Sequence, residues 1–210
     1  MTDLNTFLQK NVEGYLFEDL QTMKAATLAP GKQAGAIGYP LLMSTFAGIE
    51  LLGALLSDSP FDKNEGRQYF KDFWRNHLYS TDPYRAAAGD AFYQLARHGL
   101  AHAYVTKGDI VVFKHDPAMH LVRAPDGSIY IDAAQLADDL EHCYKAQVKP
   151  AASKRSRGAS MKARLREMQA AYRSQADKYL PLLKLPPAPF ITSVGSGSAI
   201  SYVTSSKSTG

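Results

Sequence analysis

Hydrophobic residues recur at steps of three and four along the first hundred residues, which is the spacing of one face of an α-helix. The first run covers residues 4–20 and stops before Pro30 and Gly31, a pair that interrupts helices. Asp3 or Thr2 is placed to cap its start, because short polar side chains accept hydrogen bonds from the first helical turn. These features predict an amphipathic helix over the first part of the chain.

Residues 34–56 form an almost wholly apolar run in which Glu50 is the only charged residue. A run of this length and polarity would also suit a membrane span. A carboxylate inside a bilayer is costly, however, and Gly35, Gly38 and Pro40 shorten the regular helix. We therefore predict a helix that is buried on nearly all sides of a bundle, and no membrane partner.

Two further helices follow in the pattern. Residues 61–78 carry large aromatic side chains at helical spacing, which is typical of a core. The next helix begins after Asp82 and Pro83, a favourable pair for a helix start, and ends near Ala103. The first hundred residues therefore predict a bundle of helices.

The pattern changes after residue 103 to short β-branched runs that are separated by turn residues. The runs 110–113, 119–122 and 128–131 predict a small antiparallel sheet of about three strands within residues 104–132. A further helix starts at Asp132.

The predicted fold is mainly α: a helical bundle over residues 1–149, with the small antiparallel sheet inserted after the helix that ends near residue 103. Residues 150–160 have the composition of a polar basic linker, and residues 161–185 show the spacing of another helix. Residues 186–210 are rich in Pro, Ser and Gly, and we expect either a hairpin or a disordered tail there.

The composition is that of an ordinary globular domain, with 45% hydrophobic and 21% charged residues. The single cysteine, Cys143, excludes an intramolecular disulfide framework and a thiolate zinc cluster. Residues 1–14 lack the apolar region of a secretory signal. We therefore expect a cytoplasmic protein.

The net charge is +4, but its placement is uneven. Between Lys145 and Arg166 lie eight lysines and arginines and no acid, so the rest of the chain is mildly acidic. This basic strip is either a solvated linker and helix face or a contact for nucleic acid, where each cation near a phosphate releases counterions. The residues that would make such a contact are Lys154, Arg155, Arg157, Lys162, Arg164 and Arg166.

The helix that ends near residue 103 carries the segment Arg97-His98-Gly99-Leu100-Ala101-His102. An arginine, a polar residue and a histidine a few positions later, near the end of a helix, resemble the signature of the HEPN superfamily. The resemblance covers roughly residues 41–103. HEPN domains are helical bundles that often dimerise, and many are metal-independent ribonucleases of toxin and antiphage systems.

The resemblance implies that Arg97 and His102 form a catalytic pair that acts on RNA without a metal or other cofactor. Histidine transfers protons near neutral pH, and arginine can hold the scissile phosphate through its forked donors. One histidine per chain is too few for both acid and base, so the resemblance implies a homodimer whose two motifs meet at one site. His98 and Glu50 would support this site, and Tyr104 could stack on a base.

Other roles for Arg97 and His102 stay open. His102 could cap the end of the helix, where a positive charge is favoured by the helix dipole. Arg97 could instead pair with Asp90 or Glu50. The chain would then be a non-catalytic helical module that binds a protein partner or a second copy of itself, or a protein that binds RNA or nucleotides through the basic strip.

A metal site is the remaining alternative. His98 and His102 have the i, i+4 spacing of two zinc ligands, and His115 or His120 would have to supply a third. The acid that follows the first histidine in zinc proteases is absent from the motif, so we expect no metal.

Overall fold

The computed structural model of the protein describes residues 3–31, 35, 37–103, 106 and 109–183. The chain divides into two units, Met1–Ala171 and Tyr172–Gly210. The first unit holds the helices and the sheet considered below, whereas the described part of the second holds the end of helix α10 and a short 3-10 turn, η6 (Leu180–Leu182). The hairpin or tail predicted over residues 186–210 lies outside the described residues.

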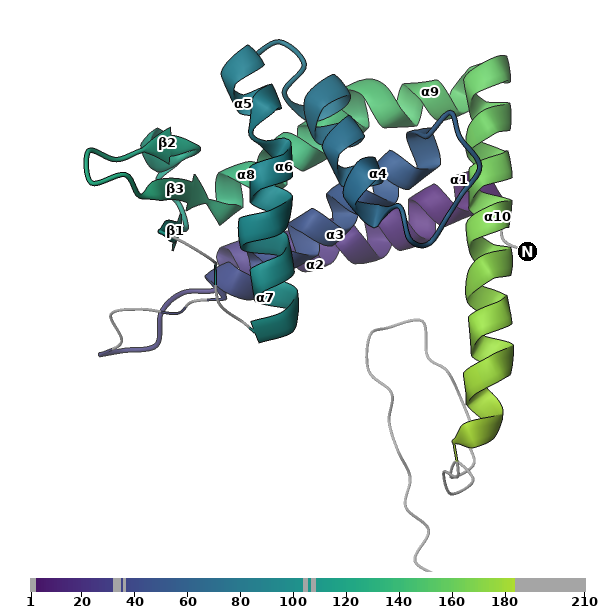
Figure 1. Cartoon of the computed structure of the whole chain (residues 1–210), viewed down its shortest axis with the longest axis horizontal. Coiled ribbons are helices and arrows are strands. Elements are labelled where there is room, and N and C mark those ends of the chain that lie inside the picture. Colours follow the sequence, from purple (N-terminus) through teal and green to yellow (C-terminus); the bar gives the residue numbers. More distant parts are fainter. Residues whose placement is uncertain (1–2, 32–34, 36, 104–105, 107–108, 184–210) are drawn as a thin grey trace, which may run out of the picture. The chain divides into compact units, whose positions relative to one another are not determined.

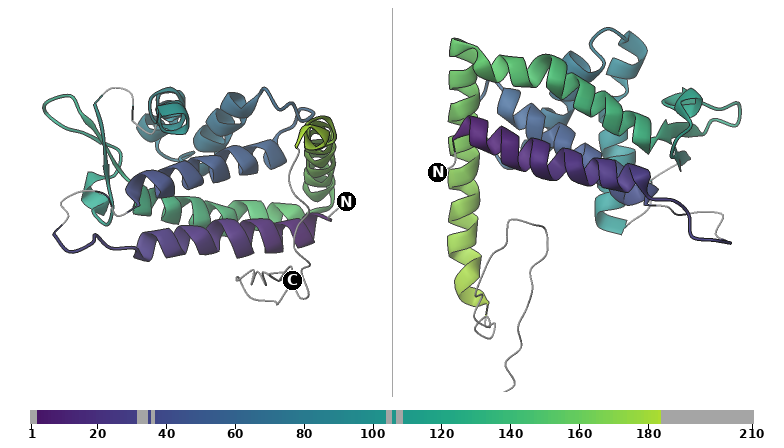
Figure 2. Two further views of the ribbon diagram at one scale, coloured as in Figure 1. Left: turned by 90° about the horizontal axis from the view of Figure 1, so that it is seen from below. Right: turned by 180° about the vertical axis from the view of Figure 1, so that it is seen from behind.

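Helix α3 (Gly38–Leu56) is the central helix of the first unit. It packs against α2 (Glu18–Ala25), α4 (Gly66–Phe73) and α8 (Ala133–Cys143), as Figures 1 and 2 show. The helix is long and apolar enough to cross a membrane, but 61% of that stretch is buried among its neighbours. Burial inside the bundle accounts for its apolar sequence, as predicted.

The N-terminal helical run consists of α1 (Leu4–Phe7), the π-helical η1 (Leu8–Phe17) and α2. Asp3 caps it, because its carboxylate accepts hydrogen bonds from the backbone N–H groups of Asn5 at 3.0 Å and Thr6 at 3.2 Å. The run lies alongside α8, to which Gln21 is hydrogen-bonded through Glu141 at 2.7 Å (Figure 2).

The aromatic run forms α4 and the π-helical η2 (Trp74–Leu78), and the segment after Asp82 forms further helix. Asp82 caps its start as predicted, since its carboxylate accepts from the N–H groups of Tyr84 and Arg85. The helix is interrupted at Ala88, where Gly89 lies so close to the Trp74 indole that a Cβ would be 2.7 Å from Cδ1. The resulting elements are α5 (Pro83–Ala87), α6 (Gly89–Phe92), the π-helical η3 (Tyr93–Arg97) and α7 (His98–Ala103).

The sheet contains β1 (Ile110–Phe113), β2 (Val122–Arg123) and β3 (Ile129–Asp132), in the order β1-β3-β2. The prediction of a mainly α fold with a small sheet is confirmed, but the sheet is mixed. Strand β2 pairs antiparallel with β3, whereas β1 pairs with β3 in parallel. The reason is that residues 114–121, which include the 3-10 turn η4 (Pro117–Met119), form a connection rather than a tight hairpin turn.

The segment predicted as a basic linker, residues 150–160, is largely helical. After α8 the chain continues through the π-helical η5 (Tyr144–Val148) and α9 (Lys149–Ser153), and α10 (Arg155–Tyr179) follows after Lys154. The linker prediction is wrong because Ala, Lys and Arg are good helix formers and Pro150 lies in the first turn of α9, where its missing N–H is not needed. The basic residues therefore have fixed positions on helices.

Candidate functional site

Arg97 lies at the last position of η3, where it forms an ion pair with Glu50 of α3. Its Nη2 is 3.1 Å from Glu50 Oε2, and the two side chains are only 29% and 28% exposed. Gly66 at the start of α4 lies against the same carboxylate and leaves no space for a Cβ. Of the two partners expected for Arg97, Glu50 is therefore the one observed.

Asp90, the other expected partner, binds Arg67 instead. The Arg67 guanidinium donates to both carboxylate oxygens of Asp90, at 2.8 and 2.7 Å. This two-bond contact with Arg67 lowers the pKa of Asp90. The Arg97–Glu50 pair thus joins η3 to α3, and the Arg67–Asp90 pair joins α4 to α6.

Tyr93 lies near charged side chains of both ion pairs, and its pKa is raised above the ordinary value. Burial raises its pKa, the charge of Glu50 raises it further, and Arg97 and Arg67 lower it. Among the described residues, Nε of Arg97 is buried and has no hydrogen-bond partner. Only the exposed 29% of the Arg97 side chain is therefore accessible to a ligand such as a phosphate oxygen.

The structure describes His98 and His102 in less detail than Arg97. His98 is the first residue of α7 and is exposed, and His102 belongs to the same helix, but its side chain is not among those described. Tyr104 lies outside the described residues. The structure therefore brings Glu50 and Arg97 together and leaves the relation of Arg97 to His102 as a prediction.

The basic strip separates into residues that point inward and residues that point outward. Arg157 forms an ion pair with Asp58 and donates to the carbonyl of Leu56 at 2.7 Å. Arg164 is only 13% exposed and pairs with Glu167 at 3.2 Å. Arg157 therefore attaches α10 to the end of α3 and the residues after it, whereas Arg164 is paired within α10. Both arginines were predicted as nucleic-acid contacts, and both are mostly shielded from solvent.

Two lysines earlier in the strip are also paired. Lys145 lies 2.6 Å from Glu141, and Lys149 lies 2.9 Å from Glu13. The Tyr144 hydroxyl and Lys149 both donate to Glu13, and these contacts lower its pKa. Four members of the strip therefore have acidic partners: Lys145, Lys149, Arg157 and Arg164.

Arg155, Lys162 and Arg166 point outward, and we call them the basic stripe. They are spaced by seven and four residues on α10, so they lie on one side of the helix over about 16 Å. All three are exposed, as is the neighbouring Lys154. None of the ion pairs formed by the described residues includes any of these four side chains.

A buried polar network joins the sheet region to the helices. His120 is 2% exposed; its Nδ1 is 3.1 Å from the carbonyl oxygen of Asp132 and its Nε2 is 3.0 Å from the hydroxyl of Tyr79. Tyr79 donates to Asp139 at 2.8 Å. Burial raises the pKa of Asp139, but hydrogen bonds from His120, Gln135 and Tyr79 outweigh this effect and leave the pKa lowered.

The sequence analysis missed this network, because its members are far apart in the chain and no spacing rule connects them. It also bears on the zinc alternative. Both ring nitrogens of His120 already have partners, and His115 Nε2 is 2.9 Å from the carbonyl oxygen of Lys24. Within the described part of the chain, no group of three or more His, Cys, Asp or Glu side chains is arranged to hold a metal ion.

Comparisons of this chain with protein-family models, with curated proteins and with solved structures found no match. The resemblance to the HEPN superfamily therefore rests on the motif residues and remains a prediction.

Proposed function

We propose that the protein binds RNA through the basic stripe, Arg155, Lys162 and Arg166. The observation that carries the proposal is their exposure on one side of α10, without an ion-pair partner among the described residues. Cations held in a row on a helix can contact successive phosphates of one strand and release the counterions bound there. Lys154 adjoins the stripe and would add a fourth contact.

The arrangement of the neighbouring acids favours this role over that of an ordinary solvated helix face. The two acids shown to contact this part of α10, Asp58 and Glu167, are paired with Arg157 and Arg164. The stripe therefore presents positive charge that no neighbouring acid offsets. Uncompensated charge of one sign attracts a polyanion over a distance of about 8–10 Å at physiological salt.

A direct test compares two triple variants with the same net charge. In the stripe variant Arg155→Gln, Lys162→Gln and Arg166→Gln are combined; in the control variant Lys10→Gln, Lys63→Gln and Arg123→Gln, which are also exposed, are combined. Fluorescence anisotropy with a single-stranded RNA should show about 10- to 100-fold weaker binding for the stripe variant and about wild-type binding for the control. Equal losses in both variants would mean that only net charge matters, and the proposal would fail.

A second candidate function is metal-independent cleavage of RNA by a homodimer, as the HEPN resemblance implies. The observation that favours it is the side chain of Arg97, which is 29% exposed on the helical run that also carries His98 and His102. In such a reaction one histidine removes the 2′-hydroxyl proton, a second protonates the departing 5′ oxygen, and arginine stabilises the charge on the phosphate. The two histidines would be His102 of each subunit.

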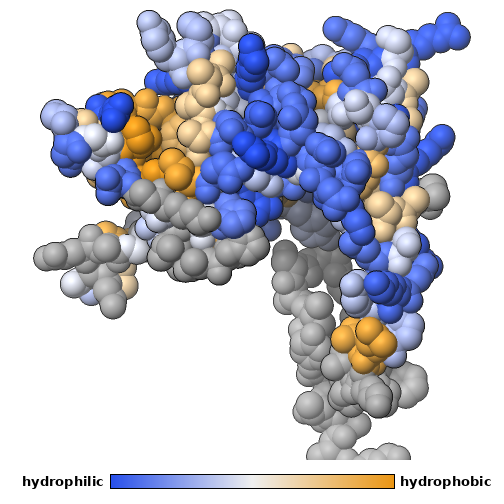
Figure 3. Space-filling model, viewed as in Figure 1, coloured by the Kyte–Doolittle hydropathy of each residue, from blue (hydrophilic) through white to orange (hydrophobic). Residues whose placement is uncertain are grey.

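Exposed apolar surface on the helical run that leads to the motif supports the dimer that this second function needs. A groove of about 200 Å³ lies between α5–α6–η3 and the sheet, and Tyr84, Leu95 and Val122 on its walls are exposed (Figure 3). Leu95 is two residues before Arg97 on η3. A protein of this type would act in the cytoplasm as a toxin or as an antiphage defence protein.

The proposed nuclease function has a separate test. Purified wild type should cleave total RNA in the presence of EDTA, and His102→Ala and Arg97→Gln should each lose this activity while remaining folded. If folded wild-type protein leaves the RNA intact, or if the protein is strictly monomeric in solution, the nuclease function is wrong. The chain would then be a non-catalytic module that binds RNA or a protein.

A further inference from the structure

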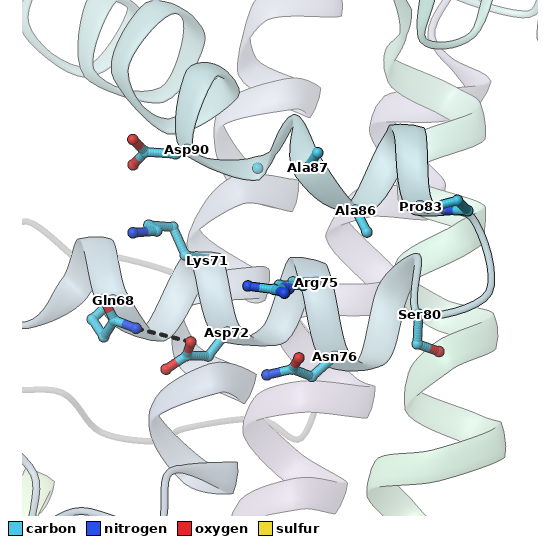
Figure 4. A pocket seen from close by; sticks show the side chains of 11 residues that line it. Gln68, Lys71, Asp72, Arg75, Asn76, Ser80, Pro83, Ala86, Ala87 and Asp90 are labelled. Atoms are coloured by element: carbon cyan, nitrogen blue, oxygen red, sulfur yellow. Dashed lines mark hydrogen bonds between the residues drawn. The ribbon is translucent and has the colours of Figure 1, made fainter.

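A polar cleft lies between α4–η2 on one side and α5–α6 on the other (Figure 4). Its volume is about 770 Å³, within the range of roughly 300–1,000 Å³ that small-molecule sites occupy. One wall is polar and carries Lys71, Arg75 and Asn76; the opposite wall is formed by small residues, among them Ala86 and Ala87. The cleft exists because this second wall has no side chains large enough to fill it.

The two walls are fixed to each other. Trp74 is fully buried, and its indole Nε1 donates to the carbonyl oxygen of Arg85 at 2.8 Å. Its ring also packs directly on Gly89, which is too close for a Cβ. Trp74 therefore holds η2 against α5 and α6, and the cleft is formed before any ligand arrives, which lowers the entropic cost of binding.

The charges along the cleft leave two cations available. The acids have partners: Asp90 is held by Arg67 through two hydrogen bonds, and Asp72 accepts from the side-chain amide of Gln68 at 2.8 Å. The charge of Lys71 also lowers the pKa of Asp90, but less than the contact with Arg67 does. In contrast, neither Lys71 nor Arg75 takes part in an ion pair with any residue that the structure describes.

The two cations are also placed to act together. Lys71 and Arg75 are four residues apart on one helical run, so they are neighbours on its surface. In Figure 4 both lie on the edge of this run nearer to Ala87, whereas Asp72 and Asn76 lie on the other edge. An arginine fork and a lysine point charge one helical turn apart match a phosphate group.

We propose that this cleft binds a small phosphate ester of about mononucleotide size. Lys71 and Arg75 hold the phosphate group. Asn76 and Ser80 supply hydrogen bonds to the hydroxyl groups of the ligand. Its uncharged part lies on an apolar surface formed by Pro83, Ala86 and Ala87. The site is separate from the basic stripe, because it is built from α4 to α6 and contains no residue of α10.

Thermal unfolding of the whole protein with added ligands tests the proposal. The probes are AMP, glucose 6-phosphate and inorganic phosphate at millimolar concentration, with adenosine and glucose as uncharged controls. We expect a phosphate ester, and neither uncharged control, to raise the Tm in a concentration-dependent manner, since a ligand that binds only the folded state stabilises it. No rise with either ester, or the same rise with adenosine or glucose, would overturn the proposal.

Variants locate the effect in the cleft. Lys71→Gln combined with Arg75→Gln should weaken binding by about 10-fold or more, whereas Lys63→Gln combined with Arg123→Gln, which removes the same charge from exposed positions elsewhere, should leave it unchanged. Equal weakening in the two pairs would contradict the assignment. The stripe variant should keep the Tm response, so loss of RNA binding and loss of phosphate-ester binding are separate outcomes.

Discussion

The motif segment and the basic stripe both bring arginine to the surface of the helices, but they use its charge in opposite ways. Arg97 is turned toward Glu50, and both side chains are mostly buried. Arg155 and Arg166 extend into solvent, and the nearby acids are paired with other cations. The first arginine therefore joins helices α3 and η3, whereas the other two provide charge for a partner.

The comparison shows what decides the role of a basic residue. The sequence does not determine either role. Arg157 and Arg164 lie in the same basic strip as the three residues of the basic stripe, and yet their side chains point inward. An inward arginine should affect folding when it is changed, and an outward one should affect binding. This difference can be measured residue by residue.

The largest effect on stability is expected at Glu50. In Glu50→Gln the charge of Arg97 stays partly buried without its carboxylate, which should reduce the free energy of unfolding by about 1–3 kcal/mol. Urea denaturation measures the change. Glu18→Gln, an exposed acid outside the described ion pairs, is the matched control and should change it by about 0.5 kcal/mol or less. Equal effects would mean that the Arg97–Glu50 pair is not a stabilising contact.

A smaller effect is expected where the inward and outward arginines share one helix. Arg157→Gln removes the ion pair with Asp58 and the hydrogen bond to Leu56, and should cost about 1 kcal/mol. Arg155→Gln should cost about 0.5 kcal/mol or less, because its side chain is exposed. If the two variants unfold at the same urea concentration, the division of the strip into inward and outward residues is wrong.

The smallest effect is a pH dependence at Glu13. The hydrogen bond from Tyr144 and the contact with Lys149 lower the pKa of Glu13 below its ordinary value of 4.5. Because the folded pKa lies below the unfolded one, the stabilisation is present above about pH 4.5 and is lost as the pH falls through the folded pKa. In urea unfolding from pH 7 to pH 3, Glu13→Gln should therefore lose less stability than wild type. Parallel curves for the two proteins would refute this account of the Lys149 pair.

Much of the fold follows from local pattern. The helix over residues 4–20, the helices within residues 34–56 and 61–78, and the caps at Asp3 and Asp82 were predictable, because periodicity and capping depend on residues close in sequence. The helix within residues 61–78 begins only at Gly66. The parallel pairing of β1 with β3 was not, since a strand pattern does not name its partner. Nor was the helical conformation of residues 150–160, where few apolar residues mark a buried face, although the helix that follows from residue 161 was predicted.

The candidate sites follow the same rule. The pairing of Arg97 with Glu50 stayed one of two alternatives, because the partners are separated by 47 residues in sequence. Only the packing of α3 against α4 and of α4 against η3 selects between them. The polar cleft left no trace in the sequence, since it results from small residues such as Ala86 and Ala87 opposite a polar helix face. The buried contacts of His120 are likewise set by tertiary structure.

The salt dependence of RNA binding tests the central proposal most directly. Three phosphate contacts contribute a slope of about −2 to the plot of log K against log salt concentration for a single strand. The stripe variant should therefore bind more weakly than wild type at low salt, with a slope smaller in magnitude by about 2, while the Lys10, Lys63 and Arg123 control keeps the wild-type slope. A stripe variant with the affinity and slope of wild type would contradict the proposal that Arg155, Lys162 and Arg166 form an RNA-binding surface.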